Sequence, residues 1–159
     1  MMVDAEMLRI FQRLCREFGD WEVKTRTQGN RTYSYVTART IMNRLDEVVG
    51  PHNWWDQYQP LERSVLCTLT IRLPGGATIS KQDAGGYAGL ADPGDDDKSG
   101  FSDAFKRTAV KFGIGRYLYG DGAPSWMNAC RRSGPKQGPE GAFDRAEEDD
   151  AALEVGAVR

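Results

Sequence analysis

The most restrictive feature of the sequence is an alternation of side-chain types between residues 64 and 73. The apolar positions are Val65, Cys67, Leu69, Ile71 and Leu73, and Thr68, Thr70 and Arg72 alternate with them. A period of two residues places these sets on opposite faces of a β-strand. Pro74-Gly75-Gly76 follows at once and predicts a turn, so residues 78–84 are expected to return as an antiparallel strand.

Other segments predict more strands and three helices. A weak strand over 54–62 completes a three-stranded meander, and residues 21–27 and 31–37 form a hairpin closed by Gln28-Gly29-Asn30. Apolar residues recur at helical spacing over residues 3–18, 38–49 and 99–112. Thr37 is the expected N-cap of the second helix, and a glycine- and aspartate-rich loop over 85–97 precedes the third. The predicted fold is therefore α+β, an antiparallel hairpin and meander packed against helices.

The composition changes after Gly122. Residues 123–159 mix proline and glycine with Arg131-Arg132 and the acidic run at 147–150, which predicts a disordered acidic tail. Residues 1–122 are expected to form a single domain. They hold 16 basic and 16 acidic side chains, so a site for a polyanion would have to be local.

Several function classes lack the residues that they need. Three cysteines and the single His52 form neither a disulfide framework nor a zinc cluster, and no segment has the apolar length of a membrane helix. The N-terminal residues lack the pattern of a secretory signal, so none is expected, and the P-loop spacing is not met. The aspartates between 92 and 97 could bind a divalent cation, but a solvated acidic loop is favoured. We therefore expect no metal, no cofactor, no enzymatic activity and a reducing cytoplasmic location.

The third predicted helix has two chemically different faces. Phenylalanine and alanine residues fall within one arc, whereas Lys106, Arg107 and Lys111 lie on the other side. The pattern alone favours an ordinary solvated surface helix, and the alternative is a cationic surface that binds a polyanion.

Residues 102–119 run from Ser102-Asp103-Ala104-Phe105-Lys106-Arg107 to Gly115-Arg116-Tyr117-Leu118-Tyr119. This segment closely resembles a motif of the Rad fifty-two type single-strand annealing proteins. The resemblance is to the branch that includes bacterial DdrA-like and phage Sak-like members. Weaker similarity covers residues 35–54 and 82–87. The resemblance implies a curved β-sheet packed on helices. It also implies assembly into rings or filaments that hold single-stranded DNA in a cationic groove and anneal complementary strands without nucleotide hydrolysis.

The resemblance also implies which residues bind DNA. Lys106 and Arg107 match the cationic pair of the family's groove, and Arg39 lies within one position of a groove arginine. Lys111 could replace a cation that the family often carries where this chain has Val110. Lys98 and Arg116 are second-rank candidates.

The expected function is binding and annealing of single-stranded DNA in recombination or repair, in a bacterial or phage-infected cell. Alternatives are a protein that protects single-stranded ends without annealing, a metal-dependent nuclease using Asp83 and the aspartates at 92–97, and a structural protein with no nucleic-acid role. The tail is either inert or a docking segment for a single-strand binding protein, recombinase or exonuclease.

Overall fold

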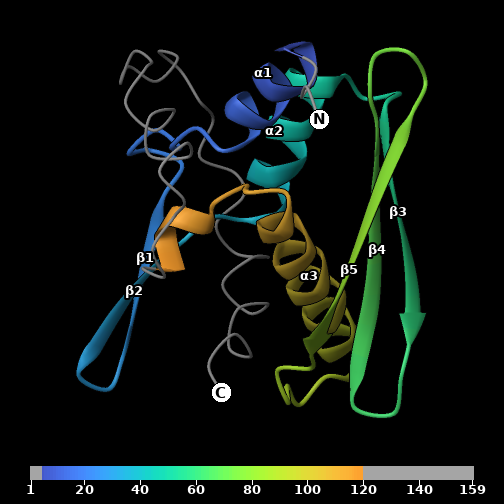
Figure 1. The fold of residues 1–159 in the computed structure, drawn as a ribbon. Helices are drawn as coiled ribbons and strands as arrows, with labels where there is room; N and C mark the ends of the chain where they lie inside the picture. The colour runs from blue at the N-terminus through green and yellow to red at the C-terminus, as the bar shows by residue number, and fades with distance from the viewer. Residues whose placement is uncertain (1–4, 120–159) are drawn as a thin grey trace.

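The computed structural model describes residues 5–119 (Figure 1). The predicted tail over 123–159 lies outside the described residues, as does the start of the first predicted helix. The described elements are α1 (Ala5–Leu14), β1 (Lys24–Gln28), β2 (Arg31–Tyr35), α2 (Ala38–Val49), β3 (Trp54–Pro60), β4 (Ser64–Arg72), β5 (Thr78–Gly86), α3 (Pro93–Lys111) and the 3-10 turn η1 (Arg116–Tyr119). The predicted α+β class is confirmed.

The strands form two antiparallel sheets. β1 pairs with β2, and β3, β4 and β5 pair in that order. The meander is antiparallel as predicted, with Cys67 opposite Tyr58 on β3 and opposite Asp83 on β5. Helix α3 packs along one face of the three-stranded sheet, and the hairpin lies on the opposite side of α3 from that sheet (Figure 1).

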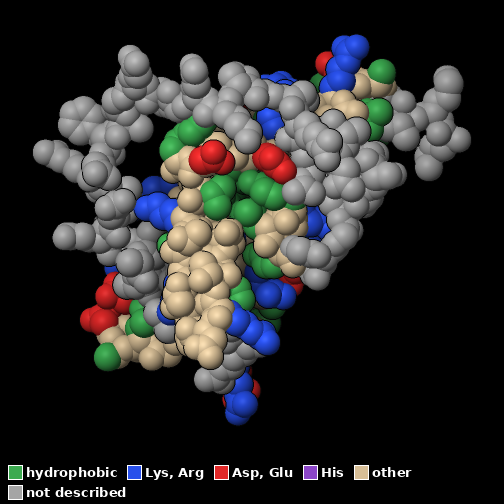
Figure 2. All heavy atoms as spheres, turned by 90° about the vertical axis from the view of Figure 1, so that its left-hand side faces the viewer, with side chains coloured by type: hydrophobic (Ala, Val, Ile, Leu, Met, Phe, Trp, Pro, Cys, Tyr) green, Lys and Arg blue, Asp and Glu red, His purple; other side chains and the backbone are tan. Residues whose placement is uncertain are grey.

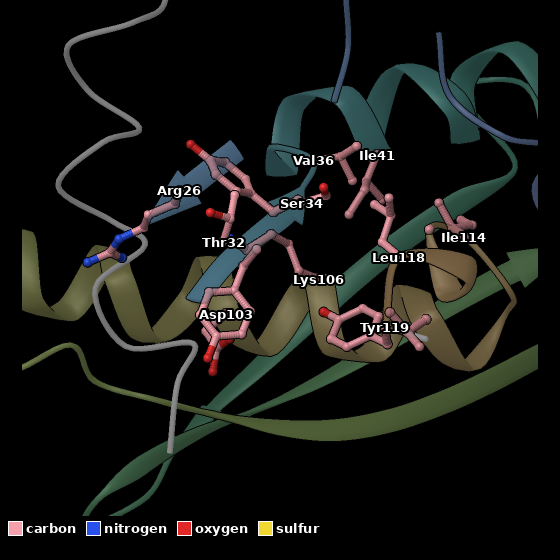
Figure 3. Close-up of a pocket in the computed structure, with 14 residues that line it drawn as sticks. Arg26, Thr32, Ser34, Val36, Ile41, Asp103, Lys106, Ile114, Leu118 and Tyr119 are labelled. Carbon is pink, nitrogen blue, oxygen red and sulfur yellow. The ribbon is translucent and has the colours of Figure 1, made fainter. Parts of the chain in front are cut away.

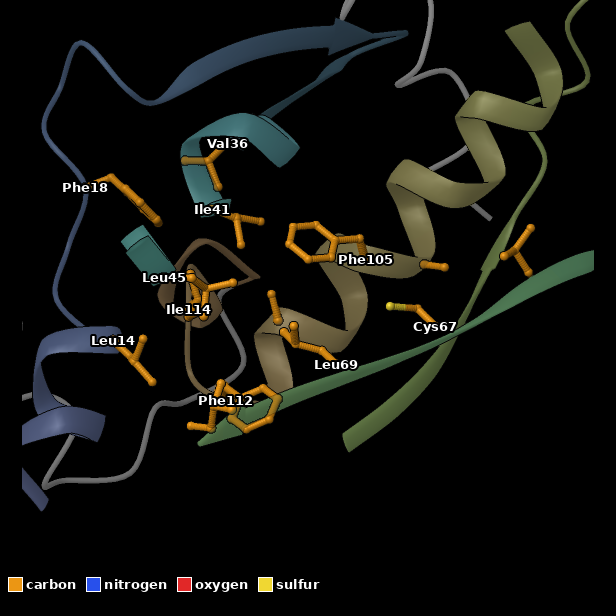
Figure 4. Packing of buried hydrophobic residues seen from close by; sticks show 14 of the residues in the cluster. Leu14, Phe18, Val36, Ile41, Leu45, Cys67, Leu69, Phe105, Phe112 and Ile114 are labelled. Atoms are coloured by element: carbon orange, nitrogen blue, oxygen red, sulfur yellow. The ribbon is translucent and has the colours of Figure 1, made fainter. Parts of the chain in front are cut away.

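A single apolar core joins the helices to the sheet. The predicted apolar positions of β4 all face it, and Phe105 points from α3 toward Ile41 of α2 (Figure 4). The largest fully buried side chains are those of Phe105, Phe112, Leu14, Ile41, Leu45, Leu69, Ile71, Ile114 and Val65. Burial of this apolar set is the main favourable term for folding.

The N-cap of α2 is confirmed. Thr37 has an extended backbone, and its Oγ1 accepts a hydrogen bond from the Thr40 N–H at 3.1 Å. The hairpin is confirmed too, but β1 begins at Lys24 rather than at Trp21. The Glu22 N–H donates to the Gly19 carbonyl at 2.9 Å, and this turn keeps the preceding residues out of the strand.

The predicted loop over 85–97 is wrong at both ends. Strand β5 continues to Gly86, and α3 begins at Pro93 rather than at Ser99. The Asp92 side chain caps the helix by accepting the Asp95 N–H at 3.0 Å. Proline at the first helical position suits this start, because its missing N–H would have no helical partner there.

Helix α3 touches β5 at backbone level, in a contact that we call the α3–β5 seam. A Cβ atom placed on Gly85 would lie 2.1 Å from the Ala104 nitrogen. One residue further on, the Gly86 N–H donates to Asp103 Oδ2 at 2.9 Å. Glycine at position 85 is therefore required because α3 occupies the space of a side chain.

Candidate nucleic-acid interface

A groove of about 500 Å³ separates the hairpin from α3 and η1 (Figure 3). Within residues 5–119, its floor is apolar and its sides carry tyrosines and two cations. The lining residues are Arg26, Thr32, Tyr33, Ser34, Tyr35, Val36, Ile41, Asp103, Lys106, Val110, Ile114, Gly115, Leu118 and Tyr119. The groove therefore combines stacking surfaces with positive charge.

Hairpin register accounts for one wall of the groove. Arg26 of β1 lies opposite Tyr33 of β2, and Lys24 lies opposite Tyr35. Directly opposed residues share a face of an antiparallel pair, so this face alternates cations with tyrosines. Figure 2 shows the side of the molecule that carries the hairpin, where Lys and Arg side chains flank a stripe of uncharged polar and backbone atoms.

Arg26 is a site residue that sequence analysis missed. Most aromatic residues in a small sheet belong to the core, and this is the interpretation that the sequence alone favours for Tyr33 and Tyr35. The available signal was the spacing of Lys24 and Arg26, two residues apart on the strand that pairs with Tyr33 and Tyr35.

Lys106 forms part of the other wall. It lies between α3 and the hairpin (Figure 3), and only 9% of its surface is exposed. The helical wheel placed Lys106, Arg107 and Lys111 together on a solvated face, which is wrong for Lys106. This part of α3 faces the hairpin across the groove, and a wheel drawn for one helix contains no information about neighbouring elements.

Arg107 and Lys111 lie outside the groove, at the edge of β5. Arg107 Nε is 3.8 Å from Asp83 Oδ1, and Lys111 Nζ is 3.4 Å from Asp83 Oδ2. The two cationic side chains are about half exposed, at 51% and 46%, whereas Asp83 is 25% exposed. One carboxylate thus faces two of the predicted DNA-binding cations.

Lys81 adds another cation to this edge. Its Nζ donates to the Lys111 carbonyl at 2.5 Å and lies 5.0 Å from the centre of the Phe112 ring. Burial, then the nearby positive charge of Arg116, lowers the pKa of the Lys81 ammonium. We call Lys81, Asp83, Arg107, Lys111 and Arg116 the rim cluster, which carries four basic side chains and one acidic side chain.

The two remaining predicted cations lie elsewhere. Arg39 is exposed in the first turn of α2, two residues before Ile41 of the groove floor, and it does not line the groove. Lys98 Nζ is 3.0 Å from Asp95 Oδ1 in the second turn of α3. The six predicted residues therefore do not form one continuous site within a single chain.

Asp103 is the one acidic side chain among the described residues that line the groove. Burial raises the pKa of its carboxyl group, while the Gly86 N–H and the neighbouring Arg107 and Lys106 lower it. Its hydrogen bond to Gly86 joins the groove to the α3–β5 seam. Asp103 therefore holds the helix that presents Lys106.

The acidic residues suggested as metal ligands have other partners. Asp92 caps α3, Asp95 pairs with Lys98, and Asp96 accepts the N–H groups of Gly89 and Leu90. Within residues 5–119, no group of three or more His, Cys, Asp or Glu side chains is placed to hold a metal ion. No helix in the described part is long and apolar enough to cross a membrane.

Comparison with known proteins gives the family. The sequence model described as "Rad52/22 family double-strand break repair protein" matches residues 6–73 and 94–134. The chain therefore belongs to the Rad52/22 family, which confirms the resemblance. The matched segments include the whole hairpin, β4 and all of α3 after Pro93, so they contain both walls of the groove.

Two relatives are both named "Single-stranded DNA-binding protein DdrA". The protein from Deinococcus radiodurans is 37% identical over 112 residues, which cover 67% of this chain and 50% of the relative. That from Deinococcus deserti is 38% identical over 109 residues, which cover 67% and 51%. The chain spans about half the length of these curated relatives.

Proposed function

We propose that the protein binds single-stranded DNA along the groove between the hairpin and α3 and anneals complementary strands in recombination or repair, without ATP. The observation that carries this proposal is the pair of cations on opposite walls, Arg26 and Lys106, in a groove that also contains Tyr33, Tyr35 and Tyr119. The two DdrA relatives are named as single-stranded DNA-binding proteins, which supports single-stranded DNA as the ligand.

The groove chemistry suits a single strand without sequence preference. Cations neutralise phosphates whatever the base, and this term depends on salt through counterion release. Tyrosine rings stack on any base. A duplex hides its base faces, so a groove lined by tyrosines favours the unpaired strand.

One protomer provides little charge. Within residues 5–119, two cations line its groove, and two of the four basic side chains of the rim cluster are paired with Asp83. Repetition of the groove in a ring or filament would make binding along one strand multivalent. We therefore propose a homo-oligomer as the active form. Recruitment of a partner protein through residues 123–159 stays a prediction.

Annealing of two complementary labelled oligonucleotides without ATP tests the function. Wild-type protein should accelerate duplex formation, and Lys106→Ala should bind a single strand more weakly, with a salt slope smaller by about 0.7 for each phosphate that the lysine no longer neutralises. Arg63→Ala is a matched control because the Arg63 side chain is 90% exposed and lies in the turn between β3 and β4.

The possible outcomes separate the alternatives. Binding without acceleration would favour protection of single-stranded ends, and loss of labelled DNA only with a divalent metal would indicate a nuclease. No binding at low salt would exclude the proposed function. Equal affinity of Lys106→Ala and Arg63→Ala would exclude the groove as the site.

A further inference from the structure

We propose that Asp83 is a built-in counterion that positions Arg107 and Lys111 and competes with DNA phosphate for them. This inference rests on the proposed function and adds a residue that limits its affinity. The Asp83 carboxylate lies between two cations on the exposed edge of the α3–β5 seam. Its oxygens are 3.8 Å from Arg107 Nε and 3.4 Å from Lys111 Nζ.

Strand periodicity explains why Asp83 is there. Cys67 is buried under α3, and Asp83 pairs with it in register, so both lie on the face that α3 covers. Strand β5 is at the edge of its sheet in the described structure. A charged side chain on the covered face of an edge strand can therefore extend past the helix to solvent.

Backbone groups restrain the carboxylate and one of its two cationic partners. Asp83 Oδ1 accepts the Ala84 N–H at 2.8 Å, and Lys111 Nζ donates to the Gln82 carbonyl. These hydrogen bonds place the Asp83 carboxylate and Lys111 side by side, while the side chains of Arg107 and Lys111 remain about half exposed to an incoming phosphate.

The strength of the ion pairs suits competition. Exposed pairs contribute little net stability, so a phosphate, which forms strong bidentate hydrogen bonds with arginine, can replace the carboxylate. In a multivalent assembly this competition is repeated at every protomer, which would lower the total affinity and ease release of the annealed duplex.

A purely structural role for Asp83 makes a different prediction. Inward-pointing charges on edge strands prevent unwanted pairing between sheets, and removing such a charge would change stability or aggregation. It would not raise affinity for DNA. The two roles are therefore distinguished by the direction of the change in DNA binding.

The test compares Asp83→Asn with Glu62→Gln by anisotropy of a labelled poly-dT oligonucleotide at several salt concentrations. Asparagine keeps an oxygen for the Ala84 N–H, and Glu62 is 91% exposed in the turn between β3 and β4. We expect Asp83→Asn to bind about 3- to 10-fold more tightly, with a salt slope steeper by about 0.7 per protomer. Glu62→Gln should match the wild type.

A double-mutant cycle with Arg107→Ala locates the effect. In the Arg107→Ala background, Asp83→Asn should raise the affinity for DNA by less than half as much as it does when Arg107 is present. Equal affinity of Asp83→Asn, Glu62→Gln and the wild type for DNA would overturn the counterion role and leave the proposed function intact. The same conclusion would follow if Asp83→Asn gave its full gain in affinity in the Arg107→Ala background. Failure of the wild type to bind poly-dT would instead overturn the function itself. Asp83→Glu, which restores the charge, should return affinity toward the wild-type value.

Discussion

The two walls of the groove are built in different ways. Helix α3 is fixed to β5 by direct backbone contact at Gly85 and by the hydrogen bond from Gly86 to Asp103. Among the described residues, the β1–β2 hairpin is a separate two-stranded sheet whose strands pair only with each other. Isolated two-stranded sheets are marginally stable. The comparison suggests a rigid wall that sets the position of Lys106 and an adaptable wall that can close on a strand.

The largest expected effect comes from the rigid wall. Gly85→Ala places a Cβ atom 2.1 Å from the Ala104 nitrogen, so α3 must move away from the sheet. We expect a loss of about 3 kcal/mol in the free energy of unfolding, as for severe overpacking. Urea unfolding followed by circular dichroism measures this loss.

Gly86→Ala is the matched control for that experiment. It adds the same methyl group one residue further along β5, where no heavy atom lies within 4 Å of the new Cβ. This variant should lose less than about 1 kcal/mol. Similar losses for the two glycine variants would show that the seam is not the rigid element of the groove.

A smaller, local effect is expected in the hairpin. Gly29 has a φ of 58° in the turn between β1 and β2, and a Cβ there would meet no atom within 4 Å. Gly29→Ala should therefore lower the stability of the hairpin by about 1–2 kcal/mol, because alanine disfavours the left-handed backbone conformation. Amide exchange of β1 and β2 should accelerate by about 5- to 30-fold, and single-stranded DNA should bind more weakly.

The same exchange experiment contains its own control. The amides of β4 and α3 should keep their wild-type exchange rates, since the hairpin forms a separate sheet. Accelerated exchange in β4 or α3 would mean that the hairpin and the seam unfold together, and the distinction between the two walls would fail.

The elements that local patterns determine were predictable from sequence. The alternation in β4 and the Thr37 cap each depend on a few neighbouring residues, and both are confirmed. The start of α3 was missed because Asp92 and Pro93 lie in a run of glycine and aspartate, a composition that equally suits a loop. A cap is recognised only when the following residues are known to be helical.

The groove was less predictable because it depends on contacts between distant segments. The family motif indicated Lys106 and Arg107, but not that Lys106 would face the hairpin across a groove while Arg107 faces Asp83. Arg26 was missed for the same reason, since its role depends on the placement of the hairpin against α3. Periodicity assigns a residue to a face of its own element and cannot say what covers that face.

The smallest expected effect concerns the pH dependence of the seam. Burial raises the pKa of the Asp103 carboxyl above its ordinary value of 3.8. Between that value and the raised pKa, the folded state holds a proton more readily than the unfolded state. Stability therefore falls as pH rises through this window. Asp103→Asn should remove this fall and keep an oxygen to accept the Gly86 N–H.

Urea unfolding of the wild type, Asp103→Asn and Glu62→Gln at a series of pH values measures the contribution of the Asp103 carboxyl to the free energy of unfolding. The difference between the wild type and Asp103→Asn isolates the Asp103 carboxyl, because the other titrating groups are common to both chains. Glu62→Gln, at a side chain that is 91% exposed, should follow the wild-type profile. A wild-type profile parallel to that of Asp103→Asn would mean that the Asp103 carboxyl has the same pKa in both states. The seam would then depend on the close approach at Gly85, with no contribution from a buried charge.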